Sequence, residues 1–535
     1  MENLIAVIIV VGSIIVSLII SFLSVKSTKT TKDFYVAGGK ISWKLNGAAM
    51  FGDYCSAASF LGVAGAVALY GIDGWWLALG FFSAWIVILL VLAGPLKKAG
   101  KFTVGDILSS RFSGNSIKVL AMLTTAIIGT LYLVPQIVGA GHLFNLLLGW
   151  NYLTTVFLSG GFIALMVVVG GMKGTTINQA IQGGILLAAM LFLLFAAALL
   201  YYNGNPLNMI SEATKVVPPK IAMDVAADVI AAAPKETVKD AVALTVAVRN
   251  AAPDAPSALT PGIDVKGIWN QLSLALGLLL GTAGLPHILI RFFTVKSSKD
   301  AQKGAEMTIV GLAIFYFSVL FVGLAAMKVM YPTLISLVSS GEIGKATNMA
   351  VPLLGKQIGG EVLLGIIAAG AMAAMLSTSV GLLISMTTSI SHDLYAGILR
   401  PHSSDKERVR FAKIGTVVFA LLAILASIWL KNQNVAVLVG MVFGIAASTF
   451  APIVLLTLWW KKLSKKGVLW GLSIGLILSL IFTFAKFLNI PYIYGIKVLI
   501  NPALYVSPIV FAVTIFVSLQ TKDKGHAEKF MAMTH

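Results

Sequence analysis

The sequence predicts an all-α membrane protein with about 13 transmembrane helices. Of its 535 residues, 58% are hydrophobic and 11% are charged, whereas soluble domains carry about 25% charged residues. The mean hydropathy is +0.93. Runs of about 20 apolar residues recur along the whole chain, and each is long enough to cross a hydrocarbon core. A β-barrel would show short segments of alternating hydrophobicity instead.

The expected spans follow the apolar runs in order. We place them near residues 3–24, 45–70, 75–96, 117–145, 152–171, 178–202, 268–293, 307–330, 361–390, 411–430, 434–459, 467–488 and 499–519. The first run has no basic segment before it and lysines after it. It is therefore predicted to be a membrane anchor rather than a cleaved signal peptide.

Basic residues predict the orientation of these spans. Dense groups of lysine and arginine occupy the loops at 97–101, 296–303, 400–410 and 461–466. Cytoplasmic loops carry such an excess, so we expect a multi-pass protein of the plasma (inner) membrane with its N-terminus outside and its C-terminus in the cytoplasm. The net charge of +18 is then mostly an orientation signal. The expected partner is the lipid bilayer and not nucleic acid, and the oligomeric state stays unknown.

Two expected spans are interrupted by residues that weaken helices. The second carries GDYCS at 52–56, and the seventh carries GTAGLPH at 281–287. Glycine and proline free backbone groups, and such groups survive in a membrane only against protein or a wet cavity. The two spans lie five apart, so they cross the membrane in opposite directions. Paired interruptions of this kind mark a transporter binding site near the bilayer midplane.

Asp53 lies inside the first interruption and is the only acidic residue well inside any expected span. It has three interpretations. Its carboxylate caps the restarting half-helix through N–H groups near Cys55 and Ser56, handles a cation or proton, or shapes a substrate pocket. Cys55 is the single cysteine of the chain, so an internal disulfide is excluded.

The ninth expected span contains AGAMAAMLSTSVG at 369–381. Small-residue faces usually serve close helix packing, and Ser and Thr often bond the carbonyl four residues earlier. The alternative is a site for a hard cation, built from the adjacent hydroxyls of Ser377 and Thr378 and a carbonyl near Ala374. Ligation by oxygen alone suits Na⁺ by the hardness rule that governs Ca²⁺ and Mg²⁺.

The seventh span offers a site for an anion. Pro286 fits the first position of a restarting half-helix, whose N–H groups and positive dipole end would receive an anionic group. His287 is either a hydrogen-bonded structural residue or a coupling residue. Arg291 is either a snorkelling or ion-paired end residue, or it takes part in coupling.

Enzyme signatures are absent from the sequence. It has no P-loop and no dinucleotide-binding fingerprint, so we predict that the protein is not an enzyme. No inner loop is long enough for a nucleotide-binding domain. Transport would therefore be driven by an ion gradient, or the passage would be passive.

Six stretches carry a resemblance to a known family. They are GDYCSAASFLG at 52–62, YLVPQIVGAG at 132–141, VGGMKGTT at 169–176, GTAGLPHILIRFFTV at 281–295, SHDLYA at 391–396 and KNQNVAVLVG at 431–440. Over nearly its whole length the chain resembles the sodium:solute symporter family, and its cation–acetate symporter branch in particular.

The resemblance implies a LeuT-like core of two inverted five-helix repeats. The implied division is 1–44 for the first span and its loop, 45–202 for the first repeat, 203–267 for an extracytoplasmic segment, 268–459 for the second repeat and 460–535 for peripheral spans and a cytoplasmic tail. The segment 203–267 is rich in Ala, Pro and Val, and we expect short amphipathic helices there.

The resemblance also implies a sodium site between the second and ninth spans. Its ligands would be the carbonyl oxygens of Gly52, Cys55 and Ala374 and the hydroxyls of Ser377 and Thr378. There are two departures. Several family members place an aspartate where this chain has Gln179, and some acetate-type relatives lack the Ser-Thr pair that it has.

The branch implies sodium-coupled uptake of a small monocarboxylate such as acetate, propionate or pyruvate, with H⁺ coupling as an alternative. The residues expected to line the substrate pocket are Ser56, Ser59, Gln136, Gly281 and Thr282. Asp53 is hypothesised to support a second cation. Three other functions stay open: a symporter for proline, pantothenate or a sugar, a sensor on a transporter scaffold, and a passive channel.

Overall fold

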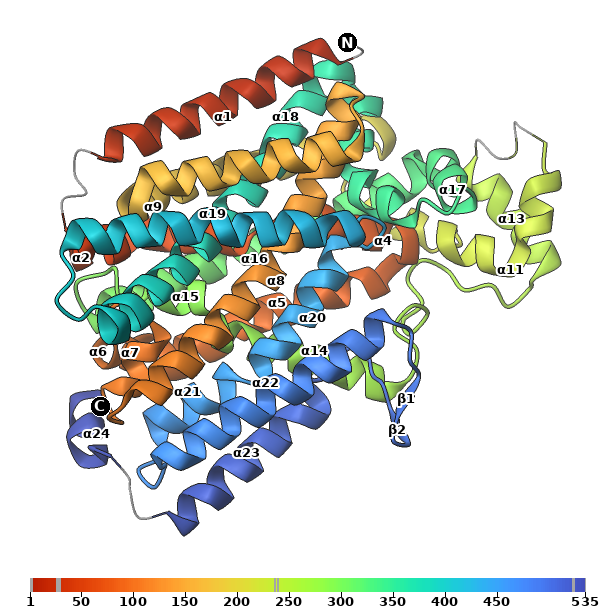
Figure 1. Cartoon of the computed structure of the whole chain (residues 1–535). Helices are drawn as coiled ribbons and strands as arrows, with labels where there is room; N and C mark the ends of the chain where they lie inside the picture. Colours follow the sequence, from red (N-terminus) through yellow and green to blue (C-terminus); the bar gives the residue numbers. More distant parts are fainter. Residues whose placement is uncertain (1–2, 26–29, 235–236, 238–239, 522–524, 535) are drawn as a thin grey trace.

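The computed structural model describes residues 3–25, 30–234, 237, 240–521 and 525–534. Within them the regular structure is helical apart from a hairpin of β1 (Tyr492–Ile493) and β2 (Ile496–Lys497). Long helices lie side by side in one bundle (Figure 1). A lobe that contains α11, α13 and α17 projects from one end of the bundle, and the C-terminal helix α24 lies toward the other end.

The helices of the first half have these bounds: α1 Leu4–Val25, α2 Thr31–Val36, α3 Trp43–Tyr54, α4 Ala64–Tyr70, α5 Trp76–Val87, α6 Ala93–Ala99, α7 Val104–Ser109, α8 Asn115–Leu148, α9 Tyr152–Tyr201, α10 Leu207–Ala213, α11 Pro219–Ala232 and α13 Ala241–Ala251. Short 3₁₀ or π segments join some of them: η1 Ala37–Gly39, η2 Ala58–Val63, η3 Gly71–Trp75 and η4 Ile88–Leu92.

The second half is built in the same way. Its helices are α14 Ile268–Gly281, α15 Pro286–Arg291, α16 Ser298–Val329, α17 Tyr331–Ser339, α18 Ile343–Ser389, α19 Asp405–Trp429, α20 Val435–Ala447, α21 Phe450–Trp459, α22 Lys465–Phe487, α23 Ala503–Gln520 and α24 Ala527–Thr534. The short segments are η5 Thr282–Gly284 and η6 Ile390–Leu399.

Eleven helical runs of the described residues are long and apolar enough to cross a membrane. One of them, Ala58–Ala99, has 42 residues, about twice what one crossing needs, and it contains the turn η3. Tyr152–Val168 is a shorter apolar helix within a predicted span. The class of a polytopic helical membrane protein is confirmed, while the count of thirteen spans stays a prediction.

Both predicted helix interruptions are present. Helix α3 ends at Tyr54, and Cys55 follows with an extended backbone (φ −72°, ψ 92°). Helix α14 ends at Gly281, and an extended Leu285 (φ −82°, ψ 113°) separates η5 from α15. A Cβ on Gly284 would lie 2.3 Å from the carbonyl oxygen of Ala446. The second interruption therefore packs against α20 at a distance that only glycine permits.

The segment 203–267 forms short helices, as predicted. It is held to the turn between α4 and α5 by Asp73, whose two carboxylate oxygens accept from the backbone N–H groups of Gly262 and Asp264, each at 2.7 Å. The N–H of Ile72 donates to the carbonyl of Ala258 at 2.7 Å. One buried carboxylate thus anchors the lobe to the bundle. The proposed division of the chain at 203 and 267, and the side of the membrane on which the lobe lies, stay predictions.

Candidate ion and substrate site

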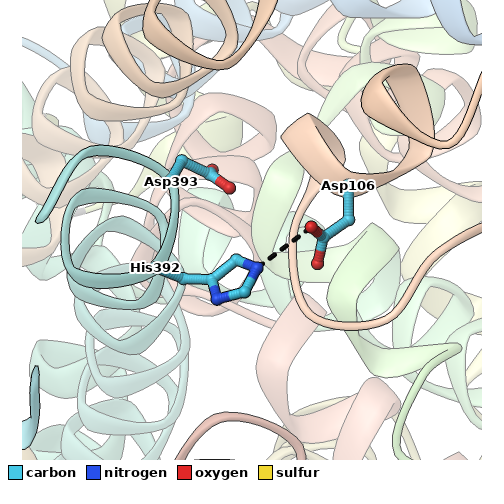
Figure 2. A group of neighbouring side chains, drawn as sticks. All are labelled: Asp106, His392 and Asp393. Atoms are coloured by element: carbon cyan, nitrogen blue, oxygen red, sulfur yellow. Dashed lines mark hydrogen bonds and ion pairs between the residues drawn. The ribbon is translucent and has the colours of Figure 1, made fainter. Parts of the chain in front are cut away.

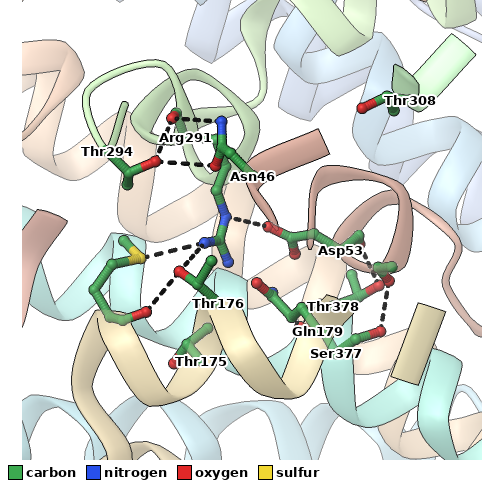
Figure 3. Close-up of polar contacts among 12 residues, drawn as sticks. Asn46, Asp53, Thr175, Thr176, Gln179, Arg291, Thr294, Thr308, Ser377 and Thr378 are labelled. Carbon is green, nitrogen blue, oxygen red and sulfur yellow. Dashed lines mark hydrogen bonds and ion pairs between the residues drawn. The ribbon is translucent and has the colours of Figure 1, made fainter. Parts of the chain in front are cut away.

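The two interrupted helices meet through a buried ion pair. The Nε of Arg291 in α15 lies 3.1 Å from Oδ2 of Asp53 in α3, and both side chains are buried. Arg291 also donates from Nη1 to Oγ1 of Thr176 at 2.9 Å and to Sδ of Met172 at 3.4 Å (Figure 3). Because both side chains are buried, each charge needs the other as its counterion, and an unpaired buried charge costs several kcal/mol.

This geometry excludes one interpretation of each of the two charged residues. Arg291 does not snorkel, because its side chain is buried and ion-paired. The capping interpretation of Asp53 is wrong: one carboxylate oxygen binds Arg291, and the other, Oδ1, has no hydrogen-bond partner among the described residues. Position in sequence gave no sign of this pairing, because the partners are 238 residues apart.

The hydroxyl pair of α18 lies against the interruption after α3. Ser377 donates from Oγ to the carbonyl of Gly52 at 2.6 Å and to that of Ala374 at 3.0 Å. Thr378 donates from Oγ1 to the carbonyl of Asp53 at 2.5 Å. Four of the five predicted ligand positions are therefore brought together, and the fifth, Cys55, lies at the interruption itself.

The carbonyl of Asp53 is an oxygen that the sequence interpretation missed. In a continuous helix it would accept from the N–H four residues later. That N–H, of Ala57, donates instead to Oε1 of Gln136 at 3.0 Å. The carbonyl is consequently left to Thr378. Residues 52 and 53 are adjacent, as are residues 377 and 378, and each hydroxyl pairs with one of the two carbonyls. This matching spacing is the sequence signal that could have identified the carbonyl of Asp53.

Buried acceptor atoms without partners lie beside this oxygen cluster. Gln179 donates from Nε2 to the carbonyl of Ser377 at 2.7 Å, while its Oε1 and the Oδ1 of Asp53 have no hydrogen-bond partner among the described residues. Figure 3 shows Gln179 and Asp53 next to the hydroxyl pair. Unpartnered buried oxygens together with carbonyls and hydroxyls suit a hard cation such as Na⁺. The donor set therefore fits the predicted ion.

The predicted substrate residues are all buried near the two interruptions. Ser59 shares a hydrogen bond of 2.9 Å with the hydroxyl of Tyr316, and Thr282 shares one of 2.8 Å with that of Tyr54. Gln136 holds the Ala57 N–H, as described above. Ser56 accepts from the N–H of Ala58 at 3.2 Å, and Gly281 ends α14.

These residues lie around a group of rings that we call the aromatic cluster: Tyr54, Phe81, Tyr132, Tyr316 and Phe443. Phe443 is the hub, with ring centroids 4.9 Å from Phe81, 5.7 Å from Tyr132 and 6.2 Å from Tyr54. Tyr316 stacks on Phe81 at 6.4 Å. The sequence interpretation missed the cluster, because its rings come from α3, α5, α8, α16 and α20 and no local spacing joins them.

His287 reaches the same cluster and is not the hydrogen-bonded structural histidine of one interpretation. Its ring centroid lies 5.3 Å from that of Tyr132, and neither ring nitrogen has a hydrogen-bond partner in the described chain. The expected row of free N–H groups after Pro286 is shorter than predicted. The N–H groups of Ile288 and Leu289 donate to the carbonyl of Leu285, and α15 has six residues. A donor for an anion is thus better sought on the imidazole.

A second polar cluster joins the SHDLYA motif to α7. Nε2 of His392 and Oδ1 of Asp106 lie 3.0 Å apart (Figure 2), and Asp106 accepts from the N–H of Phe102 at 2.9 Å. Asp393 accepts from the hydroxyls of Thr103 at 3.0 Å and Ser389 at 2.7 Å. Each carboxylate is already hydrogen-bonded, so the cluster fastens α7 to η6 instead of offering free metal ligands.

Comparisons with known proteins agree with this geometry. Residues 34–475 match the model of the "Sodium:solute symporter family". The chain is 36% identical over 468 residues to an uncharacterized symporter, YwcA, of Bacillus subtilis (strain 168), covering 87% of this chain and 83% of that protein. A solved structure of a Na⁺-coupled sialic acid symporter, substrate-bound and outward-open, is similar with a TM-score of 0.72 at 16% identity, covering 97% of this chain and 98% of that one.

The structural likeness shows the fold, which is the predicted LeuT-like one. The family and the structural relative are transporters, so the prediction that the protein is not an enzyme is confirmed, and Na⁺ is its coupling ion. Because the family match spans well over half of the chain, this chain belongs to the sodium:solute symporter family.

Proposed function

We propose that this symporter uses the sodium gradient to take up a small monocarboxylate such as acetate, propionate or pyruvate by alternating access. One observation carries the proposal furthest. At the interruption after α3, the carbonyls of Gly52 and Asp53 accept from the hydroxyl pair of α18. Four residues after Asp53, the N–H of Ala57 donates to Gln136. Ion ligands and substrate residues therefore belong to the same few residues of backbone.

Coupling follows from that shared backbone. The proposed sodium ligands are the carbonyls of Gly52, Cys55 and Ala374 and the hydroxyls of Ser377 and Thr378. The two hydroxyl groups donate their hydrogens to carbonyls of α3. The lone pairs of the hydroxyl oxygens would then face the ion. Sodium in this position would tie α3 to α18 and fix the interruption in the conformation that the substrate residues need.

The substrate pocket is proposed to lie between the two interruptions, against the aromatic cluster. Apolar ring faces would enclose the short carbon chain, and a ring N–H of His287 would donate to the carboxylate, since both of its nitrogens lack a partner in the described chain. Ser56, Ser59, Gln136, Gly281 and Thr282 would complete the wall. A buried donor that gains its partner only with substrate discriminates strongly in favour of that substrate.

Asp53 is proposed to support a second cation. One Na⁺ with one carboxylate anion moves no net charge, and the membrane potential, which supplies about 2.3 kcal/mol per charge per 100 mV, would then contribute nothing. The ion pair with Arg291 uses only one carboxylate oxygen, and Oδ1 has no partner among the described residues. It faces the same region as the unpartnered Oε1 of Gln179 (Figure 3). A second Na⁺ or a proton would be bound here.

The end of the bundle that carries α2, α6 and α7 is proposed to face the cytoplasm, because the lysine-rich segments gather there. This places the N-terminus outside and the C-terminus inside. Accessibility of single cysteines introduced at Ile5 and Met533, both with exposed side chains, to an impermeant thiol reagent in intact cells tests that orientation. Labelling at 533 but not at 5 contradicts it.

Uptake of labelled acetate into vesicles of the purified protein, with and without an imposed sodium gradient, tests the proposed function. Accumulation above equilibrium that requires the gradient is expected, together with a membrane current. Competition by propionate and pyruvate, but not by proline, pantothenate or sugars, is expected as well. Competition by the second group alone contradicts the substrate assignment, and electroneutral uptake contradicts the second cation.

A further inference from the structure

Two adjoining cavities open at the end of the bundle where α2 and α6 lie. Their volumes are about 400 and 380 Å³, within the size range of small-molecule sites. Both are lined by Lys32 and Gly38. Five lysines of the described chain line the two cavities together, and we call this set the lysine recess: Lys32, Lys40, Lys97, Lys101 and Lys173.

The charge of the recess is hardly compensated. Among the described residues, Asp33 is the one carboxylate that lines it, and its Oδ2 accepts from the N–H and hydroxyl of Thr30 in the cap of α2. Lys97 donates to the carbonyl of Phe293 at 3.3 Å. Among the described residues, none of the five lysines forms an ion pair with a carboxylate. A concave wall of one sign concentrates ions of the opposite sign.

The recess also lies next to the ion pair that joins the interrupted helices. Phe293 lines one of its cavities and follows Arg291 by two residues. Lys173 lines the other and precedes Thr176 by one helical turn, and Thr176 accepts a hydrogen bond from Arg291. Opening between α15, α9 and the start of α3 would therefore lead from the buried site directly into the lysine recess.

An orientation signal alone does not require this arrangement. Lysines that only fix topology need to lie in a cytoplasmic loop, whereas these come from three separate regions, 32–40, 97–101 and 173, and converge on one concavity. We propose that the lysine recess is an anion-binding site that receives the carboxylate of the transported substrate on its way out of the buried site. This inference rests on the proposed uptake of a carboxylate.

Side-chain exposure sets the strength of binding. Lys32, Lys40, Lys101 and Lys173 are exposed and Lys97 is half-buried, so their attraction for a carboxylate is modest and is screened by salt. Such a site draws the anion from the buried pocket without retaining it. The affinity for substrate on this side of the membrane therefore depends on the lysines, and the affinity on the other side does not.

Sided transport kinetics test the proposal. In right-side-out membrane vesicles, uptake gives the outer half-saturation concentration for acetate, and counterflow at varied internal acetate gives the inner one. The double variant K32Q/K173Q is expected to raise the inner value about fivefold and to leave the outer one unchanged, while K32R/K173R behaves as wild type. The matched control is K406Q, an exposed lysine of α19 whose neighbour Asp405 accepts from Thr31 of α2 at the same end. An equal rise on both sides, or the same rise in K406Q, overturns the proposal.

A binding measurement separates this site from the substrate assignment. A water-soluble amine-reactive reagent is applied to the purified full-length protein, and modification of each lysine is followed by mass spectrometry in sodium acetate and in sodium chloride of equal ionic strength. Modification of Lys32, Lys101 and Lys173 is expected to be about twofold slower in acetate, with Lys406 unaffected. Equal rates refute the anion site even where acetate is transported. Protection in a protein that transports no acetate keeps the site and refutes the substrate.

Discussion

Arg291 and Asp53 join the two interrupted helices of this symporter across 238 residues of sequence, with 3.1 Å between Nε and Oδ2. The pair lies at the α3 side of one interruption and at the far end of the short helix after the other. Both groups are buried. Any opening toward the lysine recess must either separate the two charges or move α3 and α15 together.

The variant Asp53→Asn is expected to lose transport and roughly 3–5 kcal/mol of stability, because it leaves the guanidinium of Arg291 buried without a counterion. The double variant Asp53→Asn, Arg291→Met removes both charges and is expected to recover most of the stability without recovering transport. Thermal unfolding of the purified protein, followed by tryptophan fluorescence, measures the first effect. A single variant that unfolds at the wild-type temperature would mean that the pair contributes no stability.

Removal of either hydroxyl of α18 is expected to weaken sodium binding more than substrate binding. Ser377→Ala and Thr378→Ala should each raise the sodium concentration for half-maximal uptake about tenfold, which corresponds to about 1.4 kcal/mol, and change the acetate KM much less. Thr378→Ser keeps the hydroxyl and should restore the wild-type value. Sodium titration of initial uptake rates provides the measurement.

The adjacent Ser379 supplies the matched control for the hydroxyl pair. It is equally buried, and its Oγ has no hydrogen-bond partner in the described chain. Ser379→Ala is therefore expected to leave sodium dependence unchanged. If it shifts that dependence as much as the changes at 377 and 378, the effect comes from packing of α18 and not from ligation.

Local chemistry made the helix breaks and the hydroxyl pair predictable. Glycine and proline act on their own backbone, so GDYCS and GTAGLPH located both interruptions, and the small hydroxyl residues of span 9 stood out within an apolar run. The same reasoning did not settle the number of spans. Ala58–Ala99 and Ile343–Leu399 exceed one crossing in length, and hydropathy alone does not say where a long helical run leaves the bilayer.

Partners distant in sequence were not predictable in this way. The sequence shows Arg291 only as a charged residue near a span end, because its counterion is fixed by packing of α15 against α3. The aromatic cluster depends on five helices, and Phe443 has no distinguishing neighbour in sequence. The lysine recess is not visible in the sequence, because the orientation rule accounts for basic residues loop by loop and does not say that Lys32, Lys97 and Lys173 converge.

His287→Phe is expected to raise the acetate KM about tenfold or more while leaving sodium dependence near wild type. The change keeps a ring against Tyr132 but removes the buried N–H that is proposed to bind the carboxylate, and hydrogen bonds to charged groups contribute about 1.5–3 kcal/mol. His287→Gln retains an N–H donor and should have the smaller effect. Acetate titrations at saturating sodium measure both, and an unchanged KM in His287→Phe argues against the imidazole as substrate donor.

Phe530→Ala is expected to release the C-terminal helix α24 from the end of the bundle. Phe530 is buried, and its ring centroid lies 5.9 Å from the guanidinium carbon of Arg111. Arg111 in turn donates to the carbonyls of Thr457 and Lys461, each at 2.7 Å, at the end of α21, and its own carbonyl accepts from the N–H of His526 at 3.0 Å.

Loss of a buried phenylalanine ring costs about 3 kcal/mol. The remaining contacts of a helix as short as α24 are not expected to compensate for that loss. Hydrogen exchange of residues 527–534 in the purified protein measures the release. Met533→Ala is the matched control, because Met533 lies on the same helix with an exposed side chain and should leave exchange slow. Equally slow exchange in both variants would show that α24 is held by its backbone contact to Arg111 and not by the ring.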